Sequence, residues 1–383
     1  MKIVYISYSI VPSRSANSIH VMQMCQAMAL NGHQVVLLVP DKKSEWEKGI
    51  DDPYDFYGVK KCFEIKKVFC RSPKGKCLVF CMAAVFIAKK MKPDFVYTRH
   101  AAGSYFSSLF NISNIFESHE PLNNILERFF FRATSRRRPM KRFIVVSEAL
   151  KKHYIEKYPW IENRISVFTD AAGPIGAGVE PVDIHNPEKR FLVGYAGHLY
   201  KGRGIEIISR LAELCPWAVF HIIGGMPDDI SHWQKRLSPF NNIVICGYVP
   251  HKEIYRYLLS FDALIAPYQE QVSVYGGKKK AGGSRDTAKW MSPLKIFEYM
   301  AAGKAIVASD LPVLREVLKH EFNALFVSPD NADAWEKALS RLKGFPELRE
   351  QLGAQARNDI EKKYNWRQRA KNIFISHENS INK

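Results

Sequence analysis

The sequence predicts an α/β protein made of two Rossmann-like, doubly wound parallel-sheet domains that face a cleft. Three observations support this prediction. The chain has 383 residues, which is too long for one ordinary core. It is 46% hydrophobic and 12% aromatic, enough to fill two cores. Short apolar strands alternate with helices in both halves, and this repetition is typical of parallel sheets covered on both faces.

The first half opens with an expected strand at residues 2–7 and an expected helix at 18–31. Gly32 follows that helix at the position where a C-cap glycine belongs. The longest apolar run, at 77–88, is too short to span a membrane and suits a buried or interfacial helix. Further strands are expected at 34–39, 94–98, 114–117, 142–146 and 164–168.

A stretch rich in glycine and proline, at residues 171–181, is expected to form a hinge before a second α/β series. We therefore expect domains at 1–180 and 188–365, with a C-terminal helix of about 366–383 that packs back on the first. Strands are expected at 191–195, 218–223, 242–246, 262–266, 305–308 and 324–327. Helices are expected at about 204–214, 251–260, 293–302, 313–318 and 331–343, with a charged helical tail from about 346.

The formal net charge is +18. Residues 60–92 hold ten basic residues and one acid, and residues 128–142 hold seven basic residues and no acid. Phenylalanines alternate with the charges, as they do in interfacial helices, which favours an anionic membrane surface as partner. A solvated face is the alternative. No nucleic-acid-binding signature is present, so nucleic acid is not an expected partner.

The seven cysteines contain no CxxC pair and no histidine at zinc spacing. They are expected to be reduced thiols in a cytoplasmic protein. With the basic surface, this indicates a peripheral protein on the inner face of the cell membrane. No metal site and no bound cofactor are expected.

The most informative segment begins at Ser292. Ser292 is a good N-cap and Pro293 suits the first helical position, so a helix is expected to begin here. A helix start can hold a phosphate, and Lys295 adds a full charge in the same turn. Glu298 shares the face of Lys295, and its carboxylate could accept two hydrogen bonds from a ribose. A capped core helix with a surface Lys–Glu pair is the alternative.

A second segment, a glycine-rich turn between a strand and a helix, runs from Gly194 to Glu206. Lys201 and Arg203 place cations there, and its glycines would let backbone approach a phosphate closely. The turn matches neither the P-loop nor the Rossmann fingerprint.

Together these segments resemble the retaining glycosyltransferases of family 4, whose two-domain architecture is called GT-B. The resemblance covers nearly the whole chain. Ser292-Pro-Leu-Lys-Ile-Phe-Glu-Tyr-Met-Ala-Ala-Gly-Lys is similar to the donor-binding motif of one branch of the family. Gly197-His-Leu-Tyr-Lys-Gly-Arg-Gly is similar to its diphosphate turn. Weaker similarities begin at Gly247, Asn323 and Asn31.

The resemblance implies a role for each matching residue. Glu298 would bind the donor ribose, and Arg203, helped by Lys295, the diphosphate. His119 would lie beside the transferred sugar, and the loop at 13–18 would close on the donor. The catalytic residues implied are His119, Arg203 and Lys295. The donor-binding residues implied are Glu298, Ser292, Pro293, Leu294, Gly197, His198, Lys201, Ser15, Ala16, Asn17, Tyr248 and Val249.

Three positions depart from the family pattern. Trp290 stands where the family often has a glutamate that contacts the sugar. His198 stands where it has a diphosphate-binding arginine, and Ser15-Ala-Asn-Ser replaces the paired glycines of the first loop. Because Trp290 replaces that glutamate, an inactive transferase is a further alternative.

The resemblance implies transfer from a nucleotide-diphosphate sugar, with a UDP- or GDP-sugar as co-substrate. No Asp-x-Asp motif occurs, so a metal-independent reaction is expected. The acceptor is expected to be a glycan that is lipid-linked or membrane-borne. Two alternatives stay open: a nucleotide-sugar epimerase that uses Glu117 and Glu120, and a basic nucleic-acid-binding or scaffold protein.

Overall fold

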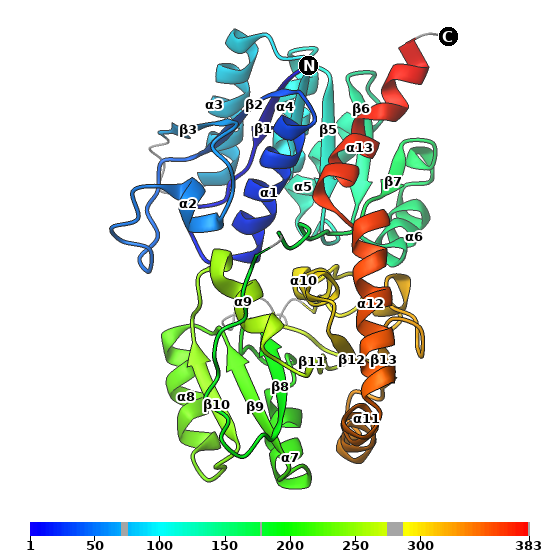
Figure 1. Ribbon diagram of the computed structural model, residues 1–383. Coiled ribbons are helices and arrows are strands. Elements are labelled where there is room, and N and C mark those ends of the chain that lie inside the picture. The colour runs from blue at the N-terminus through cyan, green and yellow to red at the C-terminus, as the bar shows by residue number, and fades with distance from the viewer. Residues whose placement is uncertain (70–75, 177, 274–285, 382–383) are drawn as a thin grey trace. The chain divides into compact units, whose positions relative to one another are not determined.

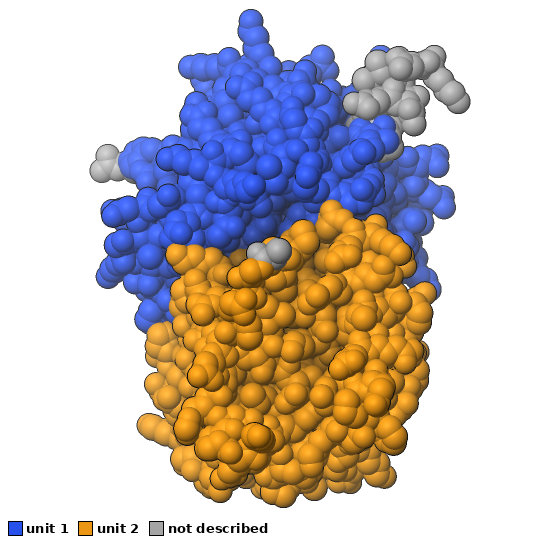
Figure 2. All heavy atoms as spheres, in the orientation of Figure 1, with its two compact units in different colours: residues 1–170, 366–383 blue, residues 171–365 orange. Residues whose placement is uncertain are grey.

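The computed structural model describes residues 1–69, 76–176, 178–273 and 286–381, with side chains for all but residues 76 and 376–381. Parts of the segments considered above lie outside the described residues: 70–75 of the basic stretch, 177 of the expected hinge and 382–383 of the last helix. The chain divides into two compact units, coloured separately in Figure 2. Unit 1 is Met1–Asp170 with Trp366–Lys383, and unit 2 is Ala171–Asn365.

Unit 1 contains a seven-stranded parallel sheet in the order β3-β2-β1-β4-β5-β6-β7 (Figure 1). Its strands are β1 (Lys2–Ile6), β2 (Gln34–Pro40), β3 (Glu64–Val68), β4 (Phe95–Thr98), β5 (Asn114–Ser118), β6 (Met140–Val145) and β7 (Ile165–Val167). Its helices are α1 (Ala16–Leu30), α2 (Pro53–Tyr57), α3 (Lys76–Met91), α4 (Ala101–Leu109), α5 (Ile125–Ser135), α6 (Glu148–Lys157) and α13 (Trp366–Ile381), with a 3₁₀ turn η1 (Pro159–Ile161).

The strand order reverses beside β1, and this decides which helices share a face. The connection from β1 to β2 runs one way along the sheet, whereas those from β3 to β4 and onwards run the other way. Because parallel crossovers are right-handed, α1 covers one face and α3, α4 and α5 cover the opposite face. Helix α13 packs beside α1 (Figure 1). Ligand sites in such sheets lie at the carboxyl ends of the strands, near this reversal.

Unit 2 contains a six-stranded parallel sheet in the order β10-β9-β8-β11-β12-β13. One apolar cluster fills each face of this sheet. Its strands are β8 (Phe191–Ala196), β9 (Ala218–Ile223), β10 (Ile243–Gly247), β11 (Ala263–Ala266), β12 (Ala305–Ser309) and β13 (Leu325–Val327). Its helices are α7 (Ile205–Leu214), α8 (Pro227–Leu237), α9 (Ile254–Leu259), α10 (Leu294–Ala302), α11 (Ala332–Gly344) and α12 (Pro346–Lys362), with 3₁₀ turns η2 (His251–Glu253) and η3 (Leu314–Glu316).

The expected strands are all present, but several details differ from the sequence analysis. The helix expected at 313–318 is only the turn η3, because the segment between Pro312 and the following loop is too short to gain a second turn. Strand β3 was not expected; its Glu-Ile-Lys-Lys-Val sequence is mostly exposed, as befits a sheet edge. No helix in the described part of the chain has the length and apolar content that crossing a bilayer requires.

Candidate active site

The start of α10 differs from the expected cap. Pro293, not Ser292, is the N-cap: its ψ is 121°, and its carbonyl accepts the N–H of Ile296 at 3.0 Å. The expectation that Ser292 caps the helix and Pro293 is its first residue was therefore wrong, because the extended Pro293 delays the helix to Leu294. No side chain of the described residues caps this start. Its first N–H groups therefore remain available to an anion.

Tyr299 fixes α10 against the end of β8. Its hydroxyl accepts the backbone N–H of Ala196 at 2.7 Å, and the ring is fully buried. Ala196 is the last residue of β8, so the glycine-rich segment leaves the strand at Gly197. The contact therefore holds α10 beside that segment. A site in which both segments bind one diphosphate needs this arrangement.

Lys295 points into the interior of unit 2 rather than to solvent. It is only 8% exposed, and its Nζ has no hydrogen-bond partner among the described residues. That Nζ lies 3.7 Å from the centroid of the Tyr195 ring and 5.1 Å from that of Tyr268. Burial, and next the charge of Arg203, lower the pKa of Lys295 well below its ordinary value, although Glu298 opposes them. A buried cation without a hydrogen-bonding anion is costly, so this position favours an incoming anion.

The backbone conformation and the nearby Lys295 both require a glycine at position 197. Its φ is 147°, and a Cβ there would lie 2.8 Å from the Nζ of Lys295. Gly202 and Gly204 have a different role from the one expected: their backbone packs against the carbonyl oxygens of Gln271 and Pro267, where a Cβ would come within 1.9 Å. The close approach that these two glycines permit is thus to protein backbone, and only Gly197 borders the lysine.

Arg203 is held loosely beside the same two tyrosines. Its Nη1 donates to the Tyr268 hydroxyl at 3.4 Å, and its Nη2 donates to the carbonyl of Ser273 at 3.5 Å. Its Nε is buried with no hydrogen-bond partner among the described residues. Both bonds are at the long limit for a hydrogen bond, so the guanidinium could exchange them for a stronger acceptor.

Glu298 has a partner that the sequence analysis missed. Its Oε1 lies 2.9 Å from the Nε2 of His251, and both side chains are largely buried. His251 closes the Gly247-Tyr-Val-Pro-His segment, which sequence reasoning singled out only as a whole. The pairing could not be read from spacing, because 47 residues separate the two side chains.

The other expected donor-binding residues of unit 2 lie around this group. Lys201 is exposed, and the ring of His198 stacks on that of Tyr200 with centroids 4.8 Å apart. Val249 packs against the core. Ser292, Leu294 and Tyr248 are half-buried.

In unit 1, His119 follows β5 and belongs to a buried polar network centred on Glu117. Glu117 is fully buried, and its Oε1 contacts the Nε2 atoms of His119 and His20, the latter at 3.0 Å. The same oxygen lies 3.2 Å from the Nη2 of Arg369, while Oε2 accepts the hydroxyl of Tyr97. Four side chains therefore converge on one carboxylate.

Arg369 comes from α13, at the far end of the sequence. Its Nε donates to the carbonyl of Thr169 at 2.8 Å, and the residue is 4% exposed. Burial alone would raise the pKa of the Glu117 carboxyl, but Arg369 and then His20 lower it well below its usual range. No sequence signal identified this arginine, because it lies on a charged helix like many surface arginines.

The proton of His119 can be assigned from this network. An ionised carboxylate can only accept, so Nε2 of His119 donates to Glu117 and Nδ1 keeps its lone pair. Burial, and next the charge of Arg99, lower the pKa of His119 to about 4, although Glu117 opposes them. His119 is therefore neutral near pH 7, with Nδ1 able to accept a hydrogen bond.

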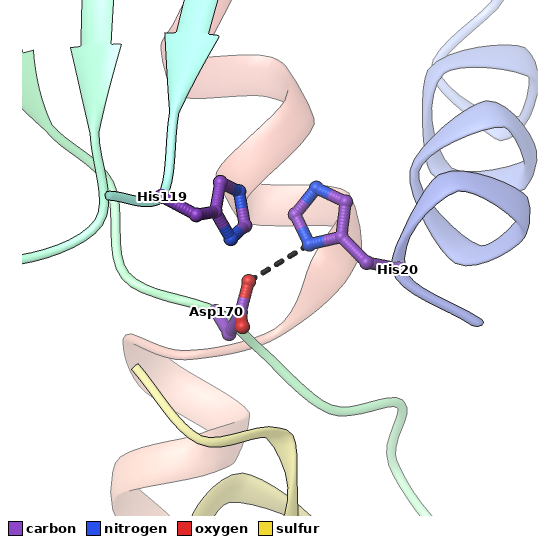
Figure 3. Close-up of side chains that lie close together, drawn as sticks. All are labelled: His20, His119 and Asp170. Carbon is purple, nitrogen blue, oxygen red and sulfur yellow. Dashed lines mark hydrogen bonds and ion pairs between the residues drawn. The ribbon is translucent and has the colours of Figure 1, made fainter. Parts of the chain in front are cut away.

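His20, His119 and Asp170 also lie close enough together to suggest a metal site (Figure 3). Their hydrogen bonds favour another interpretation. Nδ1 of His20 pairs with Oδ1 of Asp170 at 2.8 Å, and Nε2 of His119 pairs with Glu117. The buried charge of Arg369 would also repel a cation here. We therefore interpret the three residues as part of the hydrogen-bond network.

The first loop is shorter than expected, because α1 begins at Ala16 rather than at 18. Ser15 is its N-cap and accepts the N–H of Ser18 at 3.3 Å. Ala16 and Asn17 thus belong to the first turn of the helix, and Nδ2 of Asn17 donates to Oγ of Ser9 at 2.7 Å. The Ser15 cap fixes the backbone at the start of α1, whereas paired glycines would leave it more flexible.

Two family descriptions match this chain. Residues 180–359 match "Glycosyl transferases group 1", and residues 18–169 match "Glycosyltransferase Family 4". The chain is 25% identical over 241 residues to the uncharacterized glycosyltransferase MJ1607 of Methanocaldococcus jannaschii, an alignment that covers 58% of this chain and 56% of that protein. A second relative from the same organism, MJ1069, is covered to 45%, so the chain spans about half the length of the curated relatives it matches.

Solved structures share the fold over the whole chain. Sucrose-phosphate synthase from Thermosynechococcus elongatus has a TM-score of 0.70 at 15% identity, with 99% of each chain covered. Anabaena Alr3699/HepE, solved in complex with UDP-glucose, has a TM-score of 0.71 at 12% identity, with 99% of this chain and 100% of that chain covered. At such identities the likeness concerns the fold alone, and it confirms the two-sheet GT-B architecture predicted from the sequence.

We predict that Glu117→Gln destabilises unit 1 by about 3 kcal/mol or more at pH 7, because it leaves Arg369 buried without its counter-charge. The loss should shrink as pH falls below 4.5, since a carboxyl with a lowered pKa stabilises the fold only where it is ionised. Thermal unfolding followed by circular dichroism would measure both effects.

The matched control is Glu321→Gln, which removes a surface pair with Arg341 and should cost no more than about 1 kcal/mol. Equal losses in the two variants, or a loss at Glu117 that does not depend on pH, would contradict the network.

Proposed function

Since this chain belongs to the group 1 and family 4 glycosyltransferases, we propose that it transfers a sugar from a nucleotide-diphosphate sugar to a glycan acceptor. The observation that carries this proposal is the buried Nζ of Lys295, which has no hydrogen-bonding anion and lies beside Arg203, Gly197 and an uncapped helix start. A bound anion would stabilise the two basic side chains and the helix start. A diphosphate is such an anion.

The charge of the leaving group determines which interactions the donor site must provide. When the bond between the sugar and the phosphate breaks, negative charge develops on the diphosphate. Lys295, Arg203 and the N–H groups at the start of α10 would stabilise that charge as it forms, which is where electrostatic catalysis acts. These cations make a divalent metal unnecessary, so the proposed reaction is metal-independent.

Glu298 would bind the ribose, one turn along α10 from the diphosphate. Its Oε1 faces His251 at 2.9 Å, which fixes one oxygen and orients the carboxylate toward the two ribose hydroxyls. His119 would accept on Nδ1 a hydrogen bond from a hydroxyl of the transferred sugar, while Glu117 holds its ring in position. His119 is thus proposed to contact the sugar, and Glu117 and His251 to act as positioning residues.

The proposed stereochemical outcome is retention, with the acceptor attacking from the side that the diphosphate leaves. A phosphate oxygen of the leaving group would take the acceptor proton, so no enzyme nucleophile is needed. A UDP-sugar is the first donor to test, because HepE, which shares the fold, was solved with UDP-glucose; a GDP-sugar is the second.

The acceptor is proposed to be lipid-linked or membrane-borne, with the protein peripheral on the cytoplasmic face of an anionic membrane. The net charge of +18 supports this, and nucleic acid is not the proposed partner. The epimerase alternative is disfavoured by the burial of Glu117: four side chains already surround its carboxylate, so it is not free to move protons on a substrate.

We predict that UDP-glucose or a GDP-sugar at about 100 times its dissociation constant stabilises the protein by roughly 2.7 kcal/mol. Glu298→Ala and Arg203→Ala should each weaken binding about 10-fold or more, since each removes charge-assisted hydrogen bonds. A thermal-shift titration with UDP-, GDP- and ADP-sugars measures this. Arg236→Ala, an exposed change on α8, is the control and should bind normally. Wild-type affinity in both site variants would remove the site assignment.

We further predict that donor binding takes up a proton, because the diphosphate favours the charged form of a lysine whose pKa burial has lowered. The affinity for the donor should therefore fall as pH rises through the pKa that Lys295 has in the unliganded protein. Calorimetry in two buffers of different ionisation enthalpy would measure the uptake, which Lys295→Met should abolish. Lys201→Met, on the exposed part of the same turn, should leave it intact. Uptake that survives Lys295→Met would assign the proton to another group.

A further inference from the structure

Unit 1 carries a group of exposed large hydrophobic side chains on the helix layer opposite α1. Helix α3 exposes Met82 and Phe86 to 51% and 52%, and α5 exposes Ile125 to 80%. The fold does not need these side chains, because each of these helices buries a different face against the sheet. The full set is Met82, Phe86, Leu109, Phe110, Ile125, Leu126 and Phe129; we call it the α3–α5 face.

The three helices form one continuous surface. Helix α3 packs on α4, and α4 packs on α5. On the outer side, the Tyr105 ring of α4 lies 6.3 Å from the Phe129 ring of α5. Nζ of Lys89, on α3, lies 4.5 Å from the centroid of the Phe110 ring at the end of α4. The exposed apolar side chains therefore lie on adjoining helices of one layer, and apolar patches on a protein surface mark interaction sites.

The charge around this face is predominantly positive. Helices α3 and α4 contain no acidic residue, and α5 contains one, Glu127. Exposed cations border the patch at Lys89, Lys90, Lys92, Arg132, Arg136, Arg137 and Arg138.

Several of these cations lie over aromatic rings. Nζ of Lys90 is 4.9 Å from the Phe86 ring, and the guanidinium of Arg136 is 4.0 Å from the Trp160 ring. Such side chains keep their apolar stems on hydrophobic surface while the charge reaches outward. An apolar surface with cations at its border matches the boundary between anionic headgroups and acyl chains.

We propose that the α3–α5 face docks this protein on an anionic phospholipid bilayer, with Phe86, Ile125 and Phe129 inserted among the acyl chains. The bordering lysines and arginines would then contact lipid phosphates.

The placement of the face also bears on the acceptor. Ile125, its most exposed residue, follows His119 by six positions, so the two Cα atoms lie at most about 22 Å apart. Docking would bring the bilayer surface within that reach of the proposed sugar site, where a lipid-borne hydroxyl could enter. Only this last step rests on the proposed function; the docking surface stands without it.

The test is co-sedimentation of the full chain with vesicles of phosphatidylethanolamine and phosphatidylglycerol, compared with phosphatidylcholine alone. We expect binding to the anionic vesicles that weakens in high salt and little binding to the neutral ones. Ile125→Ser with Phe129→Ser should weaken binding about 10-fold or more, since two large apolar side chains no longer insert. Lys89→Gln with Lys90→Gln should weaken it about 10-fold or more at low salt.

Matched controls lie in unit 2. Phe322 and Phe345 are exposed to 45% and 60%, so Phe322→Ser with Phe345→Ser removes similar apolar area elsewhere. Lys235→Gln with Arg236→Gln removes two exposed charges from α8. Both controls should bind vesicles like the unmodified chain. Unchanged melting temperatures would show that the variants of the face are folded.

Equal binding to neutral and anionic vesicles would overturn the proposal, and so would equal losses of vesicle binding in the control variants. A third contrary result is a chain that binds no vesicles and instead forms a dimer, which Ile125→Ser with Phe129→Ser dissociates. The last result would assign the face to a second copy of the chain. Vesicle binding without any nucleotide-sugar thermal shift would retain the docking surface and contradict the transferase assignment, so the two proposals fail separately.

Discussion

A lysine side chain buried without a hydrogen-bonding anion is the constraint on which the donor site depends. Lys295 is enclosed by the rings of Tyr195 and Tyr268, and its neighbour Arg203 is also a cation. The surrounding features follow from this arrangement: Gly197 leaves room for the Nζ, Tyr299 fixes the helix that carries it, and Pro293 leaves the helix start uncapped. In the unliganded protein burial disfavours the charged form of Lys295, and a bound diphosphate would favour it.

Unit 1 differs, because there the buried charges of Glu117 and Arg369 lie against each other. Glu117 gathers His20, His119, Tyr97 and Arg369, and this single carboxylate links α1, β4, β5 and α13. The network fixes His119 as a neutral acceptor at the carboxyl edge of the sheet. It also explains why the last helix returns to the first unit: Arg369 supplies the charge that lets Glu117 stay ionised.

Much of the fold and part of the site were predictable from the sequence. Apolar strand patterns located the expected strands, and the segment from Ser292 identified α10 with Lys295 and Glu298. Local patterns could not reveal side-chain partners distant in the chain, so the pairs His251–Glu298 and Glu117–Arg369 were missed. The cap of α10 was misassigned because serine before proline suggests a cap, whereas the backbone of Pro293 adopts the extended cap conformation itself.

The most direct test of the donor site is a crystal structure of the chain with UDP-glucose bound. The account predicts diphosphate oxygens within hydrogen-bond distance of Nζ of Lys295 and of the Arg203 guanidinium, with both ribose hydroxyls on Glu298. A nucleotide bound elsewhere, with Lys295 still enclosed by Tyr195 and Tyr268 and touching no phosphate, would contradict it.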